Sequence, residues 1–269
     1  MADAPLSYEK KEVLVSIKDI SLKFGNKTIL QNVNAEIHNI VRPDKIQGQV
    51  VCFLGPSGIG KTQLSRIIAG LQPPTSGSVS VDSRPTHKGR VGVVSQTSTL
   101  FEFATLGENL KIAAAQGKTS LDRVKELVLA FELELHYEKY PTQLSGGQRQ
   151  RAAIVRQLVA GHQTILMDEP FSGLDLKMKQ QACRMITEAA NLDEKNTIIV
   201  VTHDVTEGMS IADTVWLMGK DGIHEGAGII EQYDLAAMGL CWTDELLHEP
   251  NFQQMVVEVK RRFLEIAAN

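Results

Sequence analysis

The short stretch that most constrains the fold reads Gly55-Pro56-Ser57-Gly58-Ile59-Gly60-Lys61-Thr62 and matches the phosphate-binding pattern G-x-x-x-x-G-K-[ST] at every fixed position. Glycine lets the backbone curl so that successive N–H groups point inward at a polyphosphate. Lys61 is placed to reach the β- and γ-phosphates, and the Thr62 hydroxyl is placed to bind Mg²⁺. We therefore expect every residue of this loop to belong to a nucleotide site.

The residues on either side of the loop predict the strand–loop–helix setting that the motif requires. Residues 50–54 form a continuous apolar run, as in a strand that is buried on both faces. After the loop, Leu64, Ile67, Ile68 and Leu71 recur at helical spacing. The alternative is a glycine-rich turn without a ligand, and the complete match between a strand and a helix disfavours it.

Strands and helices alternate along most of the rest of the chain. The pattern predicts strands at residues 13–23, 28–37, 78–82, 91–95, 164–168, 197–202 and 214–218, the first two antiparallel. It predicts a turn at 24–27, a loop at 38–49, helical structure between 97 and 161, and helices at 176–192, 205–211 and 250–267. We expect an α/β fold with a mainly parallel sheet, an N-terminal antiparallel β subdomain and a helical insert subdomain.

Composition narrows the classes of partner. The formal net charge of −4 gives no reason to expect a nucleic-acid partner, which usually requires a basic excess. The cysteines Cys52, Cys183 and Cys241 lie far apart without a C-x-x-C pair, so we expect reduced thiols in the cytoplasm. The first residues lack the apolar core of a secretion signal, and no apolar run reaches the length of about 18 residues needed to span a bilayer. We expect a chain that does not enter a membrane by itself.

Two carboxylates follow the predicted strand at 164–168. Asp168 and Glu169 come where open α/β sheets bind their ligands, at the carboxyl end of a strand. Asp168 would help to hold Mg²⁺, and Glu169 could accept a proton from an attacking water. A solvated strand end is the ordinary alternative for such a pair, and the phosphate-binding loop favours the functional interpretation.

The second strong motif is Leu144-Ser145-Gly146-Gly147-Gln148-Arg149-Gln150-Arg151. Its small residues leave backbone N–H groups and the Ser145 hydroxyl exposed at a helix start, which suits an anion, although an ordinary N-cap would look the same. With this motif the chain resembles the nucleotide-binding subunits of ATP-binding cassette (ABC) transporters, because residues 144–148 match the family signature and the other motifs come in the family's order. The resemblance covers about residues 13–230.

The resemblance implies a P-loop NTPase (RecA-like) core, with ATP and Mg²⁺ as cofactors. It implies a core at 1–96 and 163–235, a helical signature subdomain at 97–162 and a helical tail at 236–269. Two subunits of this family meet head to tail, so that Ser145, Gly146, Gly147 and Gln148 would serve the nucleotide of the other copy. Separate transmembrane permease subunits, and in some systems a solute-binding protein, complete the transporter. The chain would then lie in the cytoplasm, on the inner face of the cell membrane.

Four further residues receive roles from the resemblance alone. Gln96 matches the glutamine that senses Mg²⁺ and faces the transmembrane partner, and His203 matches the histidine that contacts the γ-phosphate. Asp175 ends the loop that crosses the dimer interface, and Phe24 matches the aromatic residue that stacks on adenine. With Glu169, Gln96 and His203 form the expected catalytic set, while Thr62, Gln96 and Asp168 form the expected metal set.

Two features depart from the family pattern. Gln63 stands where a second hydroxyl residue is usual, which alters one expected phosphate contact. The predicted loop at 38–49 is longer than the usual short turn.

Three segments resemble importer ATPases, especially those of the nitrate, sulfonate and taurine group: residues 140–143, the short segment 82–96 and the tail at 248–252. Residues 58–60 and 204–213 also resemble lipid-trafficking cassettes, which makes a lipid or export system the alternative.

Two other function classes were weighed against a transporter ATPase. Soluble ABC ATPases of DNA repair or translation usually carry two cassettes or a long coiled coil, and the sequence shows neither. A regulatory binder that does not hydrolyse ATP is disfavoured because Glu169 and His203 are both present.

Two aromatic residues, Phe101 and Phe103, follow Gln96 closely. They are candidates either for the local core or for docking a permease.

Overall fold

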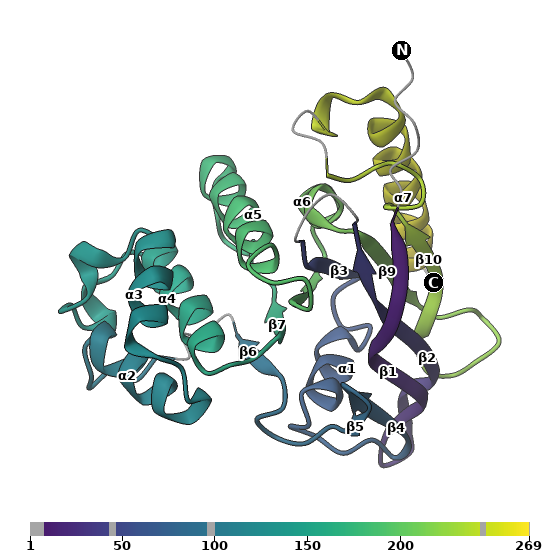
Figure 1. The fold of residues 1–269 in the computed structure, drawn as a ribbon. Helices are drawn as coiled ribbons and strands as arrows, with labels where there is room; N and C mark the ends of the chain where they lie inside the picture. Colours follow the sequence, from purple (N-terminus) through teal and green to yellow (C-terminus); the bar gives the residue numbers. More distant parts are fainter. Residues whose placement is uncertain (1–7, 43–46, 96–99, 243–245, 269) are drawn as a thin grey trace.

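The computed structural model describes residues 8–42, 47–95, 100–242 and 246–268, which form two β-sheets with helices packed around them (Figure 1). The larger sheet consists of β3 (Gln49–Leu54), β6 (Gly92–Val94), β7 (Thr164–Asp168), β8 (Thr197–Thr202), β9 (Thr214–Gly219) and β10 (Gly228–Asp234). Its order is β10-β9-β3-β8-β7-β6, with only the edge strand β10 antiparallel to its neighbour. The expectation of a mainly parallel sheet is therefore confirmed.

The smaller sheet is antiparallel and lies in the order β2-β1-β4-β5. Its strands are β1 (Glu9–Phe24), β2 (Lys27–Val41), β4 (Ser76–Val81) and β5 (Arg84–Pro85). Phe24 pairs with Lys27, so the turn between β1 and β2 consists of Gly25 and Asn26, and the φ of 57° at Gly25 suits glycine. The predicted antiparallel pair and its turn are both present.

The loop expected at residues 38–49 is wrong at its start, because β2 continues as far as Val41. β1 begins earlier than expected, at Glu9, and its first residues supply the pairing partners: Lys10 lies opposite Ile40, and Val13 opposite His38. A strand end of this kind is fixed by a distant neighbour and not by its own sequence. Residues 43–46 of the expected loop lie outside the described residues.

Helix α1 (Lys61–Ile68) lies in a core that forms between the two sheets. Val51 and Phe53 of β3 face this core, where Phe53 stacks on Trp216 with ring centroids 4.9 Å apart. Val50 and Cys52 of the same strand face the second core, on the opposite side of the larger sheet. Both faces of β3 are therefore buried, which holds the loop that follows it in one place.

The helices of the middle of the chain lie together on one side of the molecule (Figure 1). They are α2 (Leu106–Gly117), α3 (Leu121–Ala130) and α4 (Gly146–Val159), with short 3₁₀ turns at Glu134–His136 and Pro141–Gln143. Thr105, Ser120 and Ser145 cap their N-termini through side-chain hydrogen bonds. The helical insert thus forms as expected, while the division into three parts with boundaries at 96, 163 and 235 stays a prediction.

The remaining helices are α5 (Leu176–Ala190), α6 (Val205–Ile211) and α7 (Pro250–Ala268), with a 3₁₀ turn at Leu246–His248. α7 confirms the predicted tail helix, and it buries Phe252 and Val259 in the second core. β10 was not predicted, since its exposed and half-buried residues show no clear alternation and, among the described strands, it pairs only with β9. No helix in the described part of the chain combines the length and the apolar character that crossing a membrane requires.

Candidate functional site

The phosphate-binding loop connects the end of β3 to the first residue of α1. Gly58 and Gly60 adopt left-handed φ values of 81° and 107°, and a Cβ on Gly60 would lie 2.9 Å from Leu30 Cδ2. Gly60 is the N-cap of α1 and offers no side chain, so the first N–H groups of the helix have no side-chain cap. By contrast, α2 to α5 all have side-chain caps. The start of α1 is therefore free to bind phosphate oxygens.

A pocket of about 380 Å³ lies over this loop, and its size falls within the range of roughly 300–1,000 Å³ for ligand sites. The pocket combines a polar floor with an apolar wall. Its lining residues are Phe24, Ile29, Ser57, Gly58, Gly60, Lys61, Thr62, Gln63 and Glu169. Phe24 and Ile29 come from β1 and β2, so the smaller sheet supplies the apolar wall. Phe24 is 54% exposed, which leaves its ring accessible to a base.

Lys61 lies at the back of this pocket and is 6% exposed. Its Nζ donates hydrogen bonds to the carbonyl oxygens of Gly55 (2.6 Å) and Pro56 (3.0 Å), and it lies 4.0 Å from Glu169 Oε1. Burial lowers the pKa of Lys61, and the nearby carboxylates of Glu169 and Asp168 oppose that change. A phosphate beside this ammonium would favour its charged form further.

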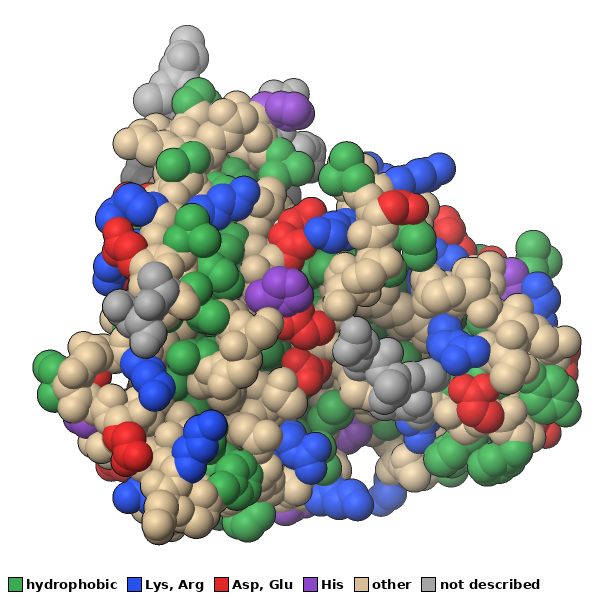
Figure 2. Space-filling model, turned by 180° about the vertical axis from the view of Figure 1, so that it is seen from behind, with side chains coloured by type: hydrophobic (Ala, Val, Ile, Leu, Met, Phe, Trp, Pro, Cys, Tyr) green, Lys and Arg blue, Asp and Glu red, His purple; other side chains and the backbone are tan. Residues whose placement is uncertain are grey.

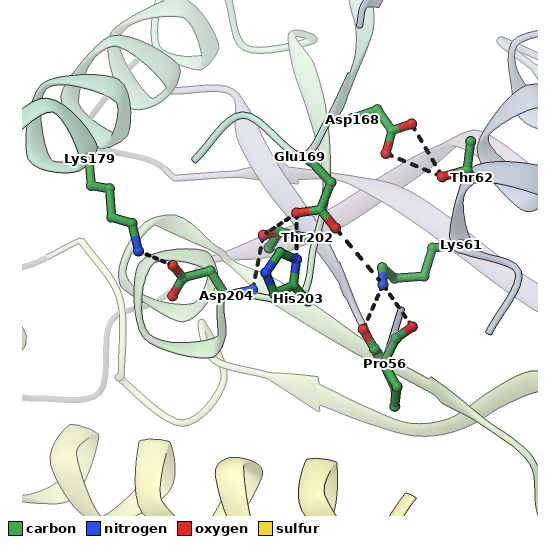
Figure 3. Close-up of polar contacts among 10 residues, drawn as sticks. Pro56, Lys61, Thr62, Asp168, Glu169, Lys179, Thr202, His203 and Asp204 are labelled. Atoms are coloured by element: carbon green, nitrogen blue, oxygen red, sulfur yellow. Dashed lines mark hydrogen bonds and ion pairs between the residues drawn. The ribbon is translucent and has the colours of Figure 1, made fainter. Parts of the chain in front are cut away.

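Thr62 and Asp168 meet between α1 and β7. The Thr62 hydroxyl donates to Asp168 Oδ2 over 3.3 Å (Figure 3). Burial raises the pKa of Asp168, although the hydrogen bond from Thr62 lowers it in part. A hydroxyl and a carboxylate are hard oxygen ligands of the type that Mg²⁺ prefers, and a cation there would stabilise the ionised form of Asp168. The pair therefore fits the magnesium site that the sequence predicts.

Glu169 is held directly after β7 by contacts with β8. Its backbone N–H donates to the Val201 carbonyl over 2.7 Å, and its φ of 51° is left-handed. Its Oε2 accepts a hydrogen bond from the Thr202 hydroxyl at 3.2 Å and lies 2.9 Å from His203 Nδ1 (Figure 3). The structure thus brings together Lys61, Thr62, Asp168, Glu169 and His203 at the carboxyl ends of β3, β7 and β8. Figure 2 shows acidic side chains along a hollow between the body that carries the sheets and the helices of the insert.

Thr202 was not singled out from the sequence, although its position offers a signal. It is a fully buried polar residue at the end of the apolar strand β8, directly before His203. Its hydroxyl also accepts a hydrogen bond from the backbone N–H of Asp204 at 3.0 Å. Lys179, which contacts both Asp204 and Glu207, was also missed, because no sequence motif includes it.

The signature residues lie away from the pocket that contains Lys61. Ser145 is the N-cap of α4: its hydroxyl accepts a hydrogen bond from Gln148 N, and Gln148 Oε1 accepts one from Ser145 N. This is the capping arrangement that was weighed as the ordinary alternative. Nonetheless, a Cβ on Gly146 or Gly147 would meet no atom within 4 Å, so this helix start is open on its outer side.

Of three other predicted site residues, the structure describes Asp175 and Gln63 but not Gln96. Asp175 is exposed and caps α5 by accepting a hydrogen bond from Met178 N at 2.8 Å, away from the pocket. Gln63 lines the pocket, and its Oε1 is buried without a hydrogen-bond partner in the part of the chain that the structure describes. Gln96, together with its predicted catalytic and metal roles, lies outside the described residues.

Phe101 and Phe103 lie where the insert begins. Phe101 is half-buried beneath the Arg156 guanidinium, whose Cζ is 4.7 Å from the ring centroid, and its backbone N–H donates to Asn109 Oδ1 at 2.7 Å. Phe103 is 80% exposed, with its ring centroid 5.5 Å from that of Phe101. Phe101 is therefore partly a core residue, and Phe103 lies on the surface.

Known proteins resemble this chain in sequence over most of its length. The family model described as ABC transporter matches residues 41–172. The spermidine/putrescine import ATP-binding protein PotA of Thermotoga maritima is 37% identical over 82% of this chain and 60% of its own length. The sulfate/thiosulfate import ATP-binding protein CysA of Pectobacterium atrosepticum is 36% identical, over 81% of this chain and 65% of its own. The Fe(3+) ions import ATP-binding protein FbpC of Escherichia coli O157:H7 is 33% identical, over 91% and 71%.

Solved structures agree with the sequence relatives. The structure of cbiO1 from Clostridium perfringens, part of an ABC transporter complex, superposes with a TM-score of 0.69 over 83% of this chain and 89% of its own, at 24% identity. A dimeric ATP-binding cassette in a post-hydrolysis state, bound to ADP and Pi, superposes with a TM-score of 0.63 over 82% of this chain and 98% of its own, at 27% identity. The chain spans about two thirds of the length of the curated relatives it matches, or slightly less.

Proposed function

Because this chain belongs to the ABC transporter family, we propose that it is the ATP-hydrolysing subunit of an ABC transporter. One observation supports this proposal above all. Groups that would bind phosphate, bind a metal and accept a proton lie at the neighbouring strand ends of β3, β7 and β8. Hydrolysis of a nucleoside triphosphate needs these groups together, because catalysis consists mainly of positioning the reactants and stabilising the charge of the transition state.

Each group has a distinct task in this mechanism. The loop from Gly55 to Thr62 would bind the phosphates of ATP through its N–H groups, and Lys61 would bind the β- and γ-phosphates. Thr62 and Asp168 would hold Mg²⁺, which supplies a positive charge beside the phosphates when it is bound. Phe24 would stack on the adenine ring from the apolar wall of the pocket.

Glu169 and His203 would act on the attacking water and on the γ-phosphate. A carboxylate next to the phosphates can orient a water and accept its proton, and the contact of 2.9 Å between Glu169 and His203 holds the two side chains together. The preformed contact also argues against a regulatory binder without hydrolysis. Gln96 would complete the catalytic and metal sets.

We further propose that two copies, or this chain and a paralogue, bind ATP head to tail. The open start of α4, where Ser145 and Gln148 cap each other, supports this arrangement, since the backbone N–H groups of Gly146 and Gly147 lie there and the site is away from its own Lys61. Asp175 would lie at the interface between the copies. The existence of a dimeric relative of known structure is consistent with the proposal.

The same proposal includes transmembrane permeases, which would bind beside Gln96 and the exposed Phe103. The chain would then work at the cytoplasmic face of the membrane, in some systems together with a solute-binding protein. Import is favoured because PotA, CysA and FbpC are each named as import ATP-binding proteins. Their solutes are spermidine/putrescine, sulfate/thiosulfate and Fe(3+) ions, so they lend no specific support to nitrate, sulfonate or taurine. A lipid-trafficking or export system, and then a soluble ABC ATPase, are the alternatives.

The direct test is the variant Glu169→Gln, assayed for Mg²⁺-dependent ATP hydrolysis and for ATP binding by calorimetry. We expect ATP affinity to persist while turnover falls by about 10²-fold or more, because a general base is lost. Glu188→Gln, an exposed site on α5, is the matched control and should behave like the parent. Turnover close to that of the parent in Glu169→Gln would remove Glu169 from the mechanism.

A further inference from the structure

The position of Glu169 depends on a short turn that follows β8. Thr202, the last residue of β8, and His203 of this turn both contact Glu169 Oε2, at 3.2 Å and 2.9 Å. The Thr202 hydroxyl donates to that carboxylate and at the same time accepts from the backbone N–H of Asp204 at 3.0 Å. A displacement of Asp204 would therefore move the hydroxyl and the imidazole that hold Glu169.

Asp204 is itself held from another element. Lys179, in the first turns of α5, forms a hydrogen bond and ion pair with Asp204 Oδ2 (Figure 3). Its Nζ also lies 3.6 Å from Glu207 Oε1. The hydrogen bond to Asp204 raises the pKa of Lys179, which keeps this side chain charged at neutral pH. Lys179 thus bridges α5 to the start of α6.

The backbone of Lys179 contacts Asp175, the N-cap residue of α5. The backbone N–H of Lys179 donates to the Asp175 carbonyl at 2.9 Å, and Asp175 caps this helix. Asp175 is the residue that the proposed function assigns to the face between two copies. A continuous set of bonds therefore connects Asp175, Lys179, Asp204, Thr202 and Glu169.

From this geometry we propose that Lys179 is a positioning residue for hydrolysis, which holds the turn 202–204 in register and so orients both His203 and Glu169. The inference rests on the proposed function, and it adds a route by which the face between copies reaches the catalytic carboxylate. Lys179 does not line the nucleotide pocket, so its effect would pass through Asp204. The side chains of this ion pair are 25% and 21% exposed, so the pair is partly buried and its removal has a cost in stability that must be measured beside the change in geometry.

The test compares Lys179→Met with Lys179→Arg and with Lys177→Met, an exposed lysine of the same helix. We expect kcat for ATP hydrolysis to fall by about 10- to 10²-fold in Lys179→Met, because small misplacements of reacting groups have effects of that size. KM for ATP should stay close to the parent value, and the variant should remain folded at the assay temperature, which its melting temperature checks. Lys179→Arg should restore most of the rate, Lys177→Met should match the parent, and Asp204→Asn combined with Lys179→Met should add little further loss.

A second measurement does not depend on hydrolysis. The side-chain nitrogen signals of His203, assigned with His203→Gln, should shift in the NMR spectrum of Lys179→Met and stay unchanged in Lys177→Met. Unchanged His203 signals in Lys179→Met would overturn the inference, whether or not the protein hydrolyses ATP. So would a parent-like kcat, or a loss of rate that Lys179→Arg fails to restore and that follows a fall in melting temperature. Absence of hydrolysis in the parent protein would instead contradict the proposed function.

Discussion

At the scale of single residues, Lys61 is a buried charge whose pKa is lowered by burial and raised by nearby carboxylates. Its ammonium is buried, donates to two backbone carbonyls and has a lowered pKa, yet it faces the carboxylates of Asp168 and Glu169. A charge in such surroundings is retained in a protein when it binds something, since burying it costs free energy. Binding of phosphates explains the arrangement better than stability does.

We expect Lys61→Ala to weaken ATP binding by at least about tenfold, because a charge-assisted hydrogen bond to phosphate is lost. Isothermal titration calorimetry with MgATP measures the change. Lys88→Ala, which removes an exposed lysine, should keep the parent affinity. Equal affinities for the parent and for Lys61→Ala would count against the whole nucleotide site.

Sequence alone predicted the residues that act through a local motif. The loop around Lys61 and the pair Asp168 and Glu169 could be assigned because their neighbours in the chain create their setting. Thr202 and Lys179 could not, since what makes them relevant is contact with residues 33 and 25 positions away. Contacts between distant segments leave no spacing pattern in one sequence.

At the scale of elements, Asp213 links the starts of β3 and β9 to Trp242, which lies after β10 in the chain. This buried residue directly precedes β9, its Oδ2 accepts a hydrogen bond from Val50 N of β3 at 2.6 Å, and its Oδ1 accepts one from Trp242 Nε1. Burial raises the pKa of Asp213 to about 7, the two hydrogen bonds oppose that rise, and the nearby carboxylate of Asp234 adds to it. The larger sheet therefore carries a titrating group at the N-terminal ends of β3 and β9.

The raised pKa makes the free energy of unfolding depend on pH. Between the ordinary pKa of 3.8 and about 7, the folded state keeps a proton that the unfolded chain loses. The contribution of Asp213 to the free energy of unfolding is thus largest below this window, decreases as the pH rises through it, and is constant above it. Urea unfolding at about pH 5 and about pH 8 should give a smaller pH difference for Asp213→Asn than for the parent. An identical difference in both proteins would assign the pH dependence to other groups.

Element boundaries show why some of the fold was missed. The turn at Gly25 and the strand β3 were predicted because their own residues specify them. β10 and the end of β2 exist because β9 and β1 present free edges for pairing, at positions such as Ile229 opposite Met218 and Ile40 opposite Lys10. Edge pairing of this kind depends on the partner strand and is invisible in local propensity.

At the scale of the whole molecule, the start of α4 at Ser145 caps its own helix and remains open on its outer side, where we propose that a second copy binds. We expect Glu169→Gln with ATP to form a dimer, since ATP would bridge this surface and the loop of another copy. Size-exclusion chromatography with light scattering measures the mass. Adding Ser145→Arg should return the protein to a monomer, because a large side chain would occupy the phosphate position.

Ser145→Arg also removes a helix cap, which costs about 1 kcal/mol in typical proteins, so its melting temperature must be measured alongside. Ser76→Arg on the exposed edge of β4 provides the control for added charge and should still dimerise. A monomer in the Glu169→Gln protein saturated with ATP, or a dimer that survives Ser145→Arg, would contradict the head-to-tail arrangement.

The left-handed backbone conformation of Glu169 has opposite consequences for thermal stability and for the proposed ATP hydrolysis. At a φ of 51°, any residue other than glycine typically loses about 1 kcal/mol, yet the site keeps a glutamate there. Glu169→Gly should therefore unfold at a higher temperature than Glu169→Ala while both fail to hydrolyse ATP, which differential scanning calorimetry would measure. A selection for heat resistance alone would favour glycine at this position and would abolish the proposed hydrolysis, so thermostable variants of this protein should be selected for turnover at the same time.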